Sequence, residues 1–279
     1  MSDLINMLTV SEKIALAALL VISPPDGRSF TRKMIGPHTY TPSHVLSDQL
    51  LLQLIEKRVV QIYAKGADTV SSQSSVLSPG VNLRLTIKND KECFDRLIDG
   101  LNLKQYPSSR NGDIEGLLAQ VLVDECMMFL SELTSLDISE YRSIDSVYRY
   151  LVEILSYRSM SETYMLLWRA VNDADPIEER FYYLKGNGAT NLERLIQKAF
   201  QFHLEYKESG KRIKPFIRKA KTPTSSITLL LMEELFGLGS SYYRYPFPLL
   251  ASQAETEIAY LSEDEKLYLN YNVPQWQIS

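Results

Sequence analysis

Apolar positions in the first ninety residues change from helical spacing to strand-like spacing. An apolar helix is expected over residues 11–21, before a proline- and glycine-containing segment ends it. Thr41 and Pro42 mark a second helix start, a capping hydroxyl before a proline at the first helical position. Leucines at helical spacing carry this helix to about Lys57. Between the two, residues 29–35 are expected to form one or two helical turns.

Two segments after the second helix have the composition of β-strands. Residues 59–64 are β-branched and aromatic, and residues 81–87 alternate apolar and polar side chains. A polar stretch over residues 65–80 separates them. Helix, short helix, helix, strand, long loop and strand is the element order of a winged helix-turn-helix domain with a two-stranded wing. The pattern of elements therefore predicts a winged-helix-like domain over residues 1–88.

From residue 89 onward the chain has helical periodicity almost throughout. Capping residues and helix-ending glycines predict successive helices that begin near residues 89, 113, 143, 161, 175, 190, 226 and 262. No internal repeat of fixed period interrupts them. We therefore predict a mainly α protein, with the winged-helix-like domain at residues 1–88 (three helices and a two-stranded wing) and an all-helical domain at residues 89–279.

The composition is that of an ordinary globular protein. The chain is 45% hydrophobic and 23% charged, with a net charge of −4, which excludes disordered and collagen-like classes. Only Cys93 and Cys126 occur in 279 residues, which favours a reducing compartment. The apolar stretch at residues 14–22 is too short to span a bilayer and lacks the basic flank of a signal peptide. We expect a cytoplasmic protein with no membrane partner.

The charge is distributed unevenly along the chain. Residues 207–221, which we call the basic segment, carry seven Lys or Arg against one acidic residue, whereas residues 89–205 carry twelve against twenty. Such a segment can neutralise phosphates or dock an acidic partner. The cations expected to contact phosphate are Lys211, Arg212, Lys214, Arg218 and Lys219. The competing interpretation is a solvated segment that balances the acidic body of the chain.

The helix at residues 42–57 is the expected recognition helix. The nucleic-acid contacts predicted here and around the short helix before it are Gln49, Gln53, Lys57, Arg28, Arg32 and Lys33. Glutamine can read adenine through paired hydrogen bonds in the major groove, and the basic residues would contact the backbone. Asp48 and Glu56 on the same helix would face phosphates, so this domain alone should bind duplex weakly.

The sequence contains no catalytic signature. The histidines match no metal-ligand spacing, and the Gly-containing turns lack the flanking residues of a phosphate loop or a nucleophile elbow. Asp173, Asp175, Glu178 and Glu179 come closest to a metal site, but a helix start explains Asp175 and Glu178. We predict no catalytic residue, no metal and no cofactor. His203, on an apolar helical stripe, is expected to be a core histidine with satisfied hydrogen bonds.

An aromatic and proline-containing segment follows residue 240. A protein interface is one role for its side chains, which are Tyr242, Tyr243, Arg244, Tyr245 and Phe247. The favoured interpretation is a stiff loop whose rings cover the helical core. A protein interface ranks second, and base stacking ranks third.

Taken together, these patterns favour a non-catalytic intracellular DNA-binding or regulatory protein that contacts the backbone of double-stranded DNA. The winged-helix-like domain and the basic segment would make the contacts. The alternative is a docking or scaffold subunit of a larger assembly, with a protein partner or self-association and no nucleic acid. An enzyme with a metal site built from scattered carboxylates, including Asp173 and Asp175, ranks behind both.

Overall fold

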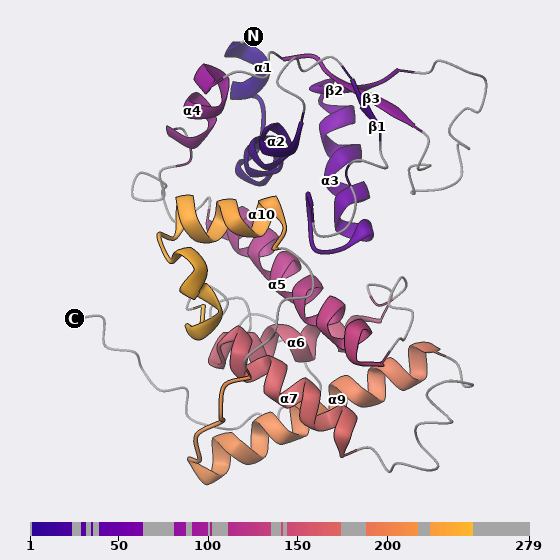
Figure 1. Cartoon of the computed structure of the whole chain (residues 1–279), viewed down its shortest axis with the longest axis vertical. Coiled ribbons are helices and arrows are strands. Elements are labelled where there is room, and N and C mark those ends of the chain that lie inside the picture. The colour runs from indigo at the N-terminus through magenta and orange to yellow at the C-terminus, as the bar shows by residue number, and fades with distance from the viewer. Residues whose placement is uncertain are drawn as a thin grey trace.

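The structure of the chain, a computed structural model, describes twelve stretches of the sequence. They are residues 2–23, 29–31, 35, 39–63, 81–87, 91–99, 101, 111–134, 141, 144–173, 188–216 and 224–247. This part of the chain is mainly helical and contains a small antiparallel sheet (Figure 1). None of its helices combines the length and the apolar character needed to cross a membrane.

The N-terminal part combines helices with a three-stranded sheet. Its elements are α1 (Ser2–Asn6), α2 (Val10–Ile22), β1 (Phe30–Thr31), α3 (His44–Glu56), β2 (Val60–Ile62) and β3 (Asn82–Leu85). The strand order is β1-β3-β2, with Phe30 opposite Leu83 and Val60 opposite Leu85. Helix α2 is apolar around most of its circumference and is therefore buried along most of its length. A capping box between Thr9 and Glu12 begins it.

The sequence predicted α2, α3, β2 and β3, but it did not predict α1, and it was wrong at two further points. Phe30 and Thr31 form a strand instead of a helical turn, so the sheet has three strands and not two. The Phe30 side chain is 3% exposed, and its burial beside β3 outweighs a weak local helix signal. The cap of α3 is Ser43, whose Oγ accepts from the backbone N–H of Leu46, and not Thr41. The rest of the expected short helix includes residues 32–34, and these lie outside the described residues, as does the loop at 64–80.

After β3, every regular element of the described residues is helical. The elements are α4 (Lys91–Asp99), α5 (Asn111–Thr134), α6 (Asp145–Tyr157), α7 (Met160–Asn172), α9 (Gly188–Ser209), α10 (Ser226–Leu229), the π-helical turn η5 (Leu230–Leu235) and the 3-10 segment η6 (Gly239–Arg244). Helix α5 runs from the N-terminal part to the opposite end, where it packs on α6 and α7 and these pack on α9 (Figure 1). Ser159 caps α7, in place of the expected Ser161, and α9 already begins before the expected cap Thr190.

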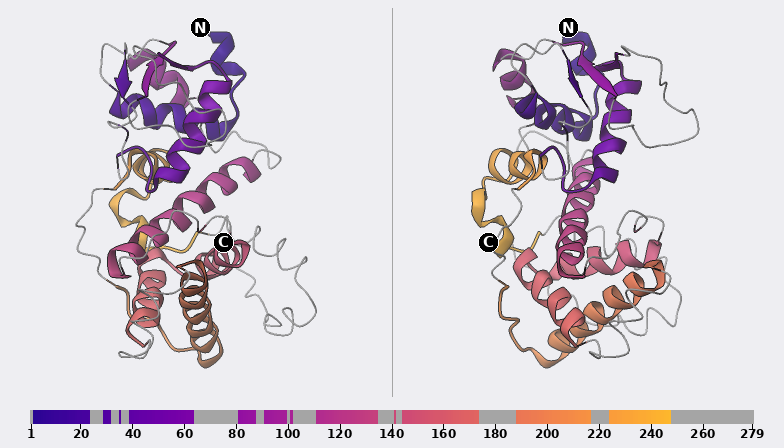
Figure 2. Two further views of the ribbon diagram at one scale, coloured as in Figure 1. Left: turned by 90° about the vertical axis from the view of Figure 1, so that its right-hand side faces the viewer. Right: turned by 45° about the vertical axis from the view of Figure 1, so that its right-hand side comes forward.

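Helix α10 connects the C-terminal part of the described chain to the N-terminal part. It packs against α2 (Figure 2), and the Ser226 hydroxyl lies 3.1 Å from the Ala18 carbonyl oxygen and 3.2 Å from that of Tyr40. The backbone N–H of Ile227 donates to the same Tyr40 carbonyl at 3.0 Å. Buried side chains on both sides of residue 88 belong to one hydrophobic core. The domain boundary near residue 88 stays a prediction from the sequence.

Replacing Tyr40 with phenylalanine should lower the free energy of unfolding by about 1 kcal/mol, because it removes one buried hydrogen bond. Tyr40 is fully buried, and its hydroxyl donates to the Ala15 carbonyl at 3.0 Å. Burial raises the pKa of this hydroxyl well above its ordinary value, so it stays a donor. Urea unfolding followed by circular dichroism measures the loss. The exposed Tyr63→Phe is the matched control, and an equal effect in both variants would contradict the assignment.

Candidate nucleic-acid interface

The basic segment begins in the last turn of α9, and the structure describes it as far as residue 216. Gly210 has a φ of 63°, the left-handed conformation that glycine adopts readily at a helix end, and the helix stops there. The chain then runs back along α7, where the Phe216 N–H donates to the Ser161 carbonyl at 2.9 Å. Ile213 is buried, and the Phe216 ring packs edge-on against Phe129 at 5.2 Å. These apolar contacts hold the segment against the helices.

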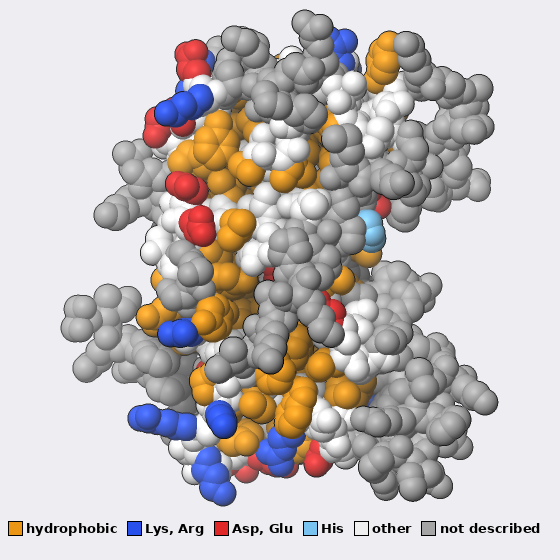
Figure 3. All heavy atoms as spheres, viewed as in Figure 1, with side chains coloured by type: hydrophobic (Ala, Val, Ile, Leu, Met, Phe, Trp, Pro, Cys, Tyr) orange, Lys and Arg blue, Asp and Glu red, His pale blue; other side chains and the backbone are white. Residues whose placement is uncertain are grey.

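The cations beside these buried anchors are exposed to solvent. The exposed ones in the described part of the segment are Lys211, Arg212 and Lys214. No carboxylate in the described residues forms an ion pair with any of them. Lys and Arg side chains gather over this end of the molecule, beside hydrophobic side chains (Figure 3). Arg218 and Lys219, the other predicted phosphate contacts, lie outside the described residues.

Lys207 has a different environment from the other cations of the segment. Its Nζ lies 3.8 Å from the centre of the Tyr157 ring, an arrangement that favours a cation–π contact. Burial lowers the pKa of Lys207, while the Glu153 carboxylate opposes this shift and Arg158 adds to it. Lys207 of α9 therefore belongs to a half-buried group that also includes Tyr157, Glu153 and Arg158.

His203 lies beside this group and is fully buried. Its Nδ1 accepts from the Nε of Arg158 at 3.3 Å, and its ring stacks near Phe200 at 6.0 Å. Burial, followed by the charges of Arg158 and Lys207, lowers the pKa of His203 to about 3. The expected core position is confirmed, but only one ring nitrogen is satisfied, because Nε2 has no hydrogen-bond partner among the described residues.

A second group of side chains adjoins the segment on α7. Trp168 is 39% exposed, and its ring is tilted against Phe216 with the centroids 6.3 Å apart. The guanidinium of Arg169 lies 4.0 Å from the Phe202 ring centre and 5.7 Å from that of Tyr206. Aromatic rings and cations therefore share this surface. The sequence alone does not reveal this group, because nothing in local spacing shows that α7 lies beside residues 207–216.

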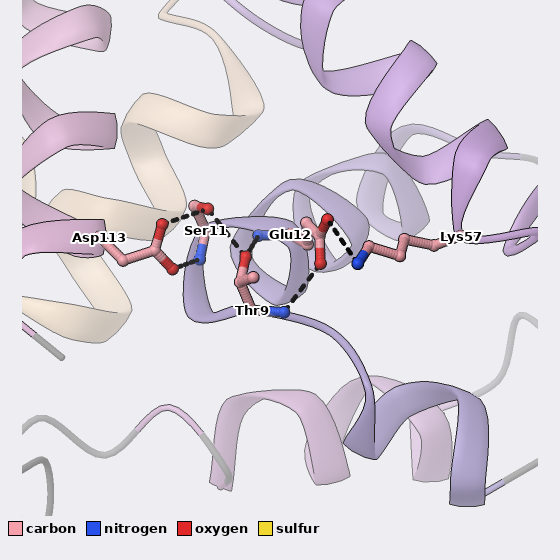
Figure 4. A network of polar contacts seen from close by, with 5 residues as sticks. All are labelled: Thr9, Ser11, Glu12, Lys57 and Asp113. Atoms are coloured by element: carbon pink, nitrogen blue, oxygen red, sulfur yellow. Dashed lines mark hydrogen bonds and ion pairs between the residues drawn. The ribbon is translucent and has the colours of Figure 1, made fainter.

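Helix α3 presents a much weaker basic surface. Gln49 and Gln53 are half-buried, and Lys57 lies 3.8 Å from the Glu12 carboxylate in the polar network around the start of α2 (Figure 4). Asp48 was expected to face phosphates, and this is wrong, because its side chain is 5% exposed and packs inside the protein. The exposed Glu56 remains on the outer surface. Arg28, Arg32 and Lys33 lie outside the described residues.

The described parts of the two predicted nucleic-acid surfaces do not adjoin. Helix α3 lies at one end of the long axis, and the described part of the basic segment lies at the other, beyond α5 (Figures 1 and 2). The structure therefore does not bring Lys57 and the glutamines of α3 together with Lys211, Arg212 and Lys214.

The aromatic segment after residue 240 mostly covers the core. Phe247 is 3% exposed and meets the Phe236 ring edge-on, and Tyr242 and Tyr243 are partly buried against the core. Arg244 is exposed, with its guanidinium 5.3 Å from the Tyr243 ring centre. Tyr245 is 51% exposed. Of the five side chains considered as an interface, the exposed ones are therefore Arg244 and Tyr245.

The acidic group considered as a metal site lies largely outside the described residues. Asp173 is described, and its carboxylate lies 3.8 Å from the Nζ of Lys198. Within the described stretches, no group of three or more His, Cys, Asp or Glu is placed to hold a metal ion.

Comparison of the chain with protein-family models, curated proteins and solved structures finds no match.

Proposed function

We propose that the chain is a non-catalytic DNA-binding protein whose basic segment contacts the phosphate backbone. The observation that carries the proposal is the exposure of Lys211, Arg212 and Lys214 on a segment held in place by buried apolar side chains. Because these cations have no acidic partner among the described residues, phosphate contact would not require breaking an ion pair. Neutralising phosphates releases counterions and supplies most of the non-specific affinity of such proteins.

We further propose that residues 1–88 form a winged-helix-like domain. In support, α3 leads directly into the antiparallel pair of β2 and β3, as a recognition helix leads into a wing. Gln49 and Gln53 remain the candidates for base contact. Since Lys57 is close to Glu12 and Glu56 is exposed, this domain would add little backbone affinity.

Duplex binding by the basic segment should be lost when its charge is reversed. In fluorescence anisotropy with a labelled mixed-sequence duplex, we expect micromolar binding at low salt that weakens steeply as salt rises. The double variant Arg212→Glu/Lys214→Glu should bind at least about tenfold more weakly. Because two phosphate contacts are lost, the slope of log affinity against log salt concentration should become shallower by about 2.

The matched control is Arg194→Glu, which reverses an exposed charge on the N-terminal half of α9. Its affinity should stay close to that of the unaltered chain. Equal weakening in the control and the double variant would indicate a non-local charge effect. A flat titration of the unaltered chain at low salt would remove the proposal.

The alternative function is protein docking or self-association in a larger assembly. The exposed Tyr245, next to the exposed Arg244, favours it, because aromatic and arginine side chains often anchor protein interfaces. Sedimentation of the purified chain would detect self-association, and Tyr245→Ala should weaken it under this alternative.

A further inference from the structure

The exposed tryptophan on α7 offers an aromatic surface beside the basic segment. Trp168 is one of a small set of large apolar side chains in the described residues that are more than one-third exposed. Phe216 packs against its ring, so the indole is supported by a residue of the basic segment itself. A solvent-facing indole with a rigid support is the geometry of a stacking platform.

Cations lie close along the chain to this indole and to the Phe216 ring that supports it. Arg169 follows it on α7 and is held by the rings of Phe202 and Tyr206, with an Nη1–Oη distance of 3.4 Å to Tyr206. Lys214 precedes Phe216 by two residues, so the two Cα atoms are at most about 7 Å apart. The aromatic surface therefore adjoins positive charge, which complements an anionic backbone carrying flat, apolar bases.

We infer that Trp168 stacks on an unpaired base of a single strand while Arg212 and Lys214 contact the phosphates that flank it. This inference rests on the proposed function and names the strand form that this surface prefers. Bases in a duplex are already stacked on their neighbours and do not present a free face. Single-stranded DNA therefore gains the stacking contact that duplex DNA lacks, and phosphate contacts are common to both.

The experiment uses the full chain and its intrinsic fluorescence. The sequence has two tryptophans, and Trp276→Phe leaves Trp168 as the only one. Titration of this variant with an oligothymidylate should quench the indole emission as the base stacks. In anisotropy with labelled strands, the same oligothymidylate should bind at least about tenfold more tightly than a mixed-sequence duplex of equal length.

Removing the indole should weaken single-strand binding selectively. Trp168→Ala should reduce affinity for the oligothymidylate roughly 5- to 150-fold and leave duplex affinity within about twofold. The salt slope should not change, since no phosphate contact is removed. Trp168→Leu, which keeps apolar packing on Phe216 but has no aromatic face, should lose the same affinity, and Trp168→Phe should recover part of it. Tyr63→Ala removes another exposed aromatic side chain, which directly follows β2, and should have no effect.

The outcomes separate this inference from the function on which it rests. Duplex binding that depends on Arg212 and Lys214, with no preference for single strands and no effect of Trp168→Leu, would overturn the inference and leave the proposed function intact. Absence of binding to either form would overturn both. If Trp168→Ala does not fold, Trp168→Leu and Trp168→Phe supply the comparison.

Discussion

Replacing Ser43 with alanine should lower the free energy of unfolding by about 2–4 kcal/mol, more than a typical capping substitution. The Ser43 side chain makes two buried contacts. Its Oγ accepts from the Leu46 N–H at 3.1 Å and donates to a carboxylate oxygen of Asp124 on α5. Loss of the cap accounts for about 1 kcal/mol, and loss of a donor to a fully buried carboxylate accounts for the rest.

The comparison is with an exposed serine–aspartate contact that also reaches α5. Ser11 donates from its backbone N–H and its hydroxyl to Asp113, at 2.9 and 2.7 Å (Figure 4). Ser11→Ala should cost less than about 1 kcal/mol because water can replace the lost donor. Urea unfolding at pH 7 measures both variants. Similar losses for Ser11→Ala and Ser43→Ala would show that the buried carboxylate does not depend on the Ser43 hydroxyl.

Acidification from pH 7 to pH 5 should destabilise the protein by about 2 kcal/mol through His203 alone. Its pKa is lowered to about 3 in the folded chain, mainly by burial and further by Arg158 and Lys207, and lies near 6.5 in the unfolded chain. Between these values the unfolded state binds the proton and the folded state does not. The contribution to stability is therefore complete above about pH 6.5 and falls by about 1.4 kcal/mol per pH unit below it.

A variant without a titratable ring at this position isolates the effect. His203→Gln keeps an acceptor for Arg158 and should make stability less dependent on pH between 7 and 5. Urea unfolding at pH 7, 6 and 5 compares it with the unaltered chain. His44→Gln, at an exposed position on α3, is measured in parallel as the comparison at a second histidine. If the free energy of unfolding of His203→Gln depends on pH as steeply as that of the unaltered chain, then His203 gains its proton without cost in the folded state.

Local pattern predicted the long helices α2 and α3 and the two strands that follow them, but it did not predict β1 or the cap of α3. The apolar runs of α2 and α3 are many residues long, so their periodicity is unambiguous. Strand β1 has two residues, and its pairing depends on β3, about fifty positions away. The cap of α3 also depends on a distant residue. Thr41 and Pro42 carry the stronger local signal, but Ser43 has Asp124 as a tertiary partner.

The candidate site, like the fold, could be predicted only in part from the sequence. Counting charge along the chain was enough to find Lys211, Arg212 and Lys214. It could not find Trp168, because the contact between its ring and Phe216 joins residues nearly fifty positions apart. The buried position of His203 followed from its helical stripe, whereas its unsatisfied Nε2 depends on which side chains surround it.

The packing of α10 on α2 affects the order in which the chain can fold during synthesis. The hydroxyl of Ser226 and the carbonyl of Ala18 that it contacts are separated by 208 positions. A nascent chain therefore leaves this surface of α2 open to water until most of the protein has emerged from the ribosome. A premature stop before α10 would damage both ends of the molecule, since the N-terminal part would lack a helix that it takes from the C-terminal half of the sequence.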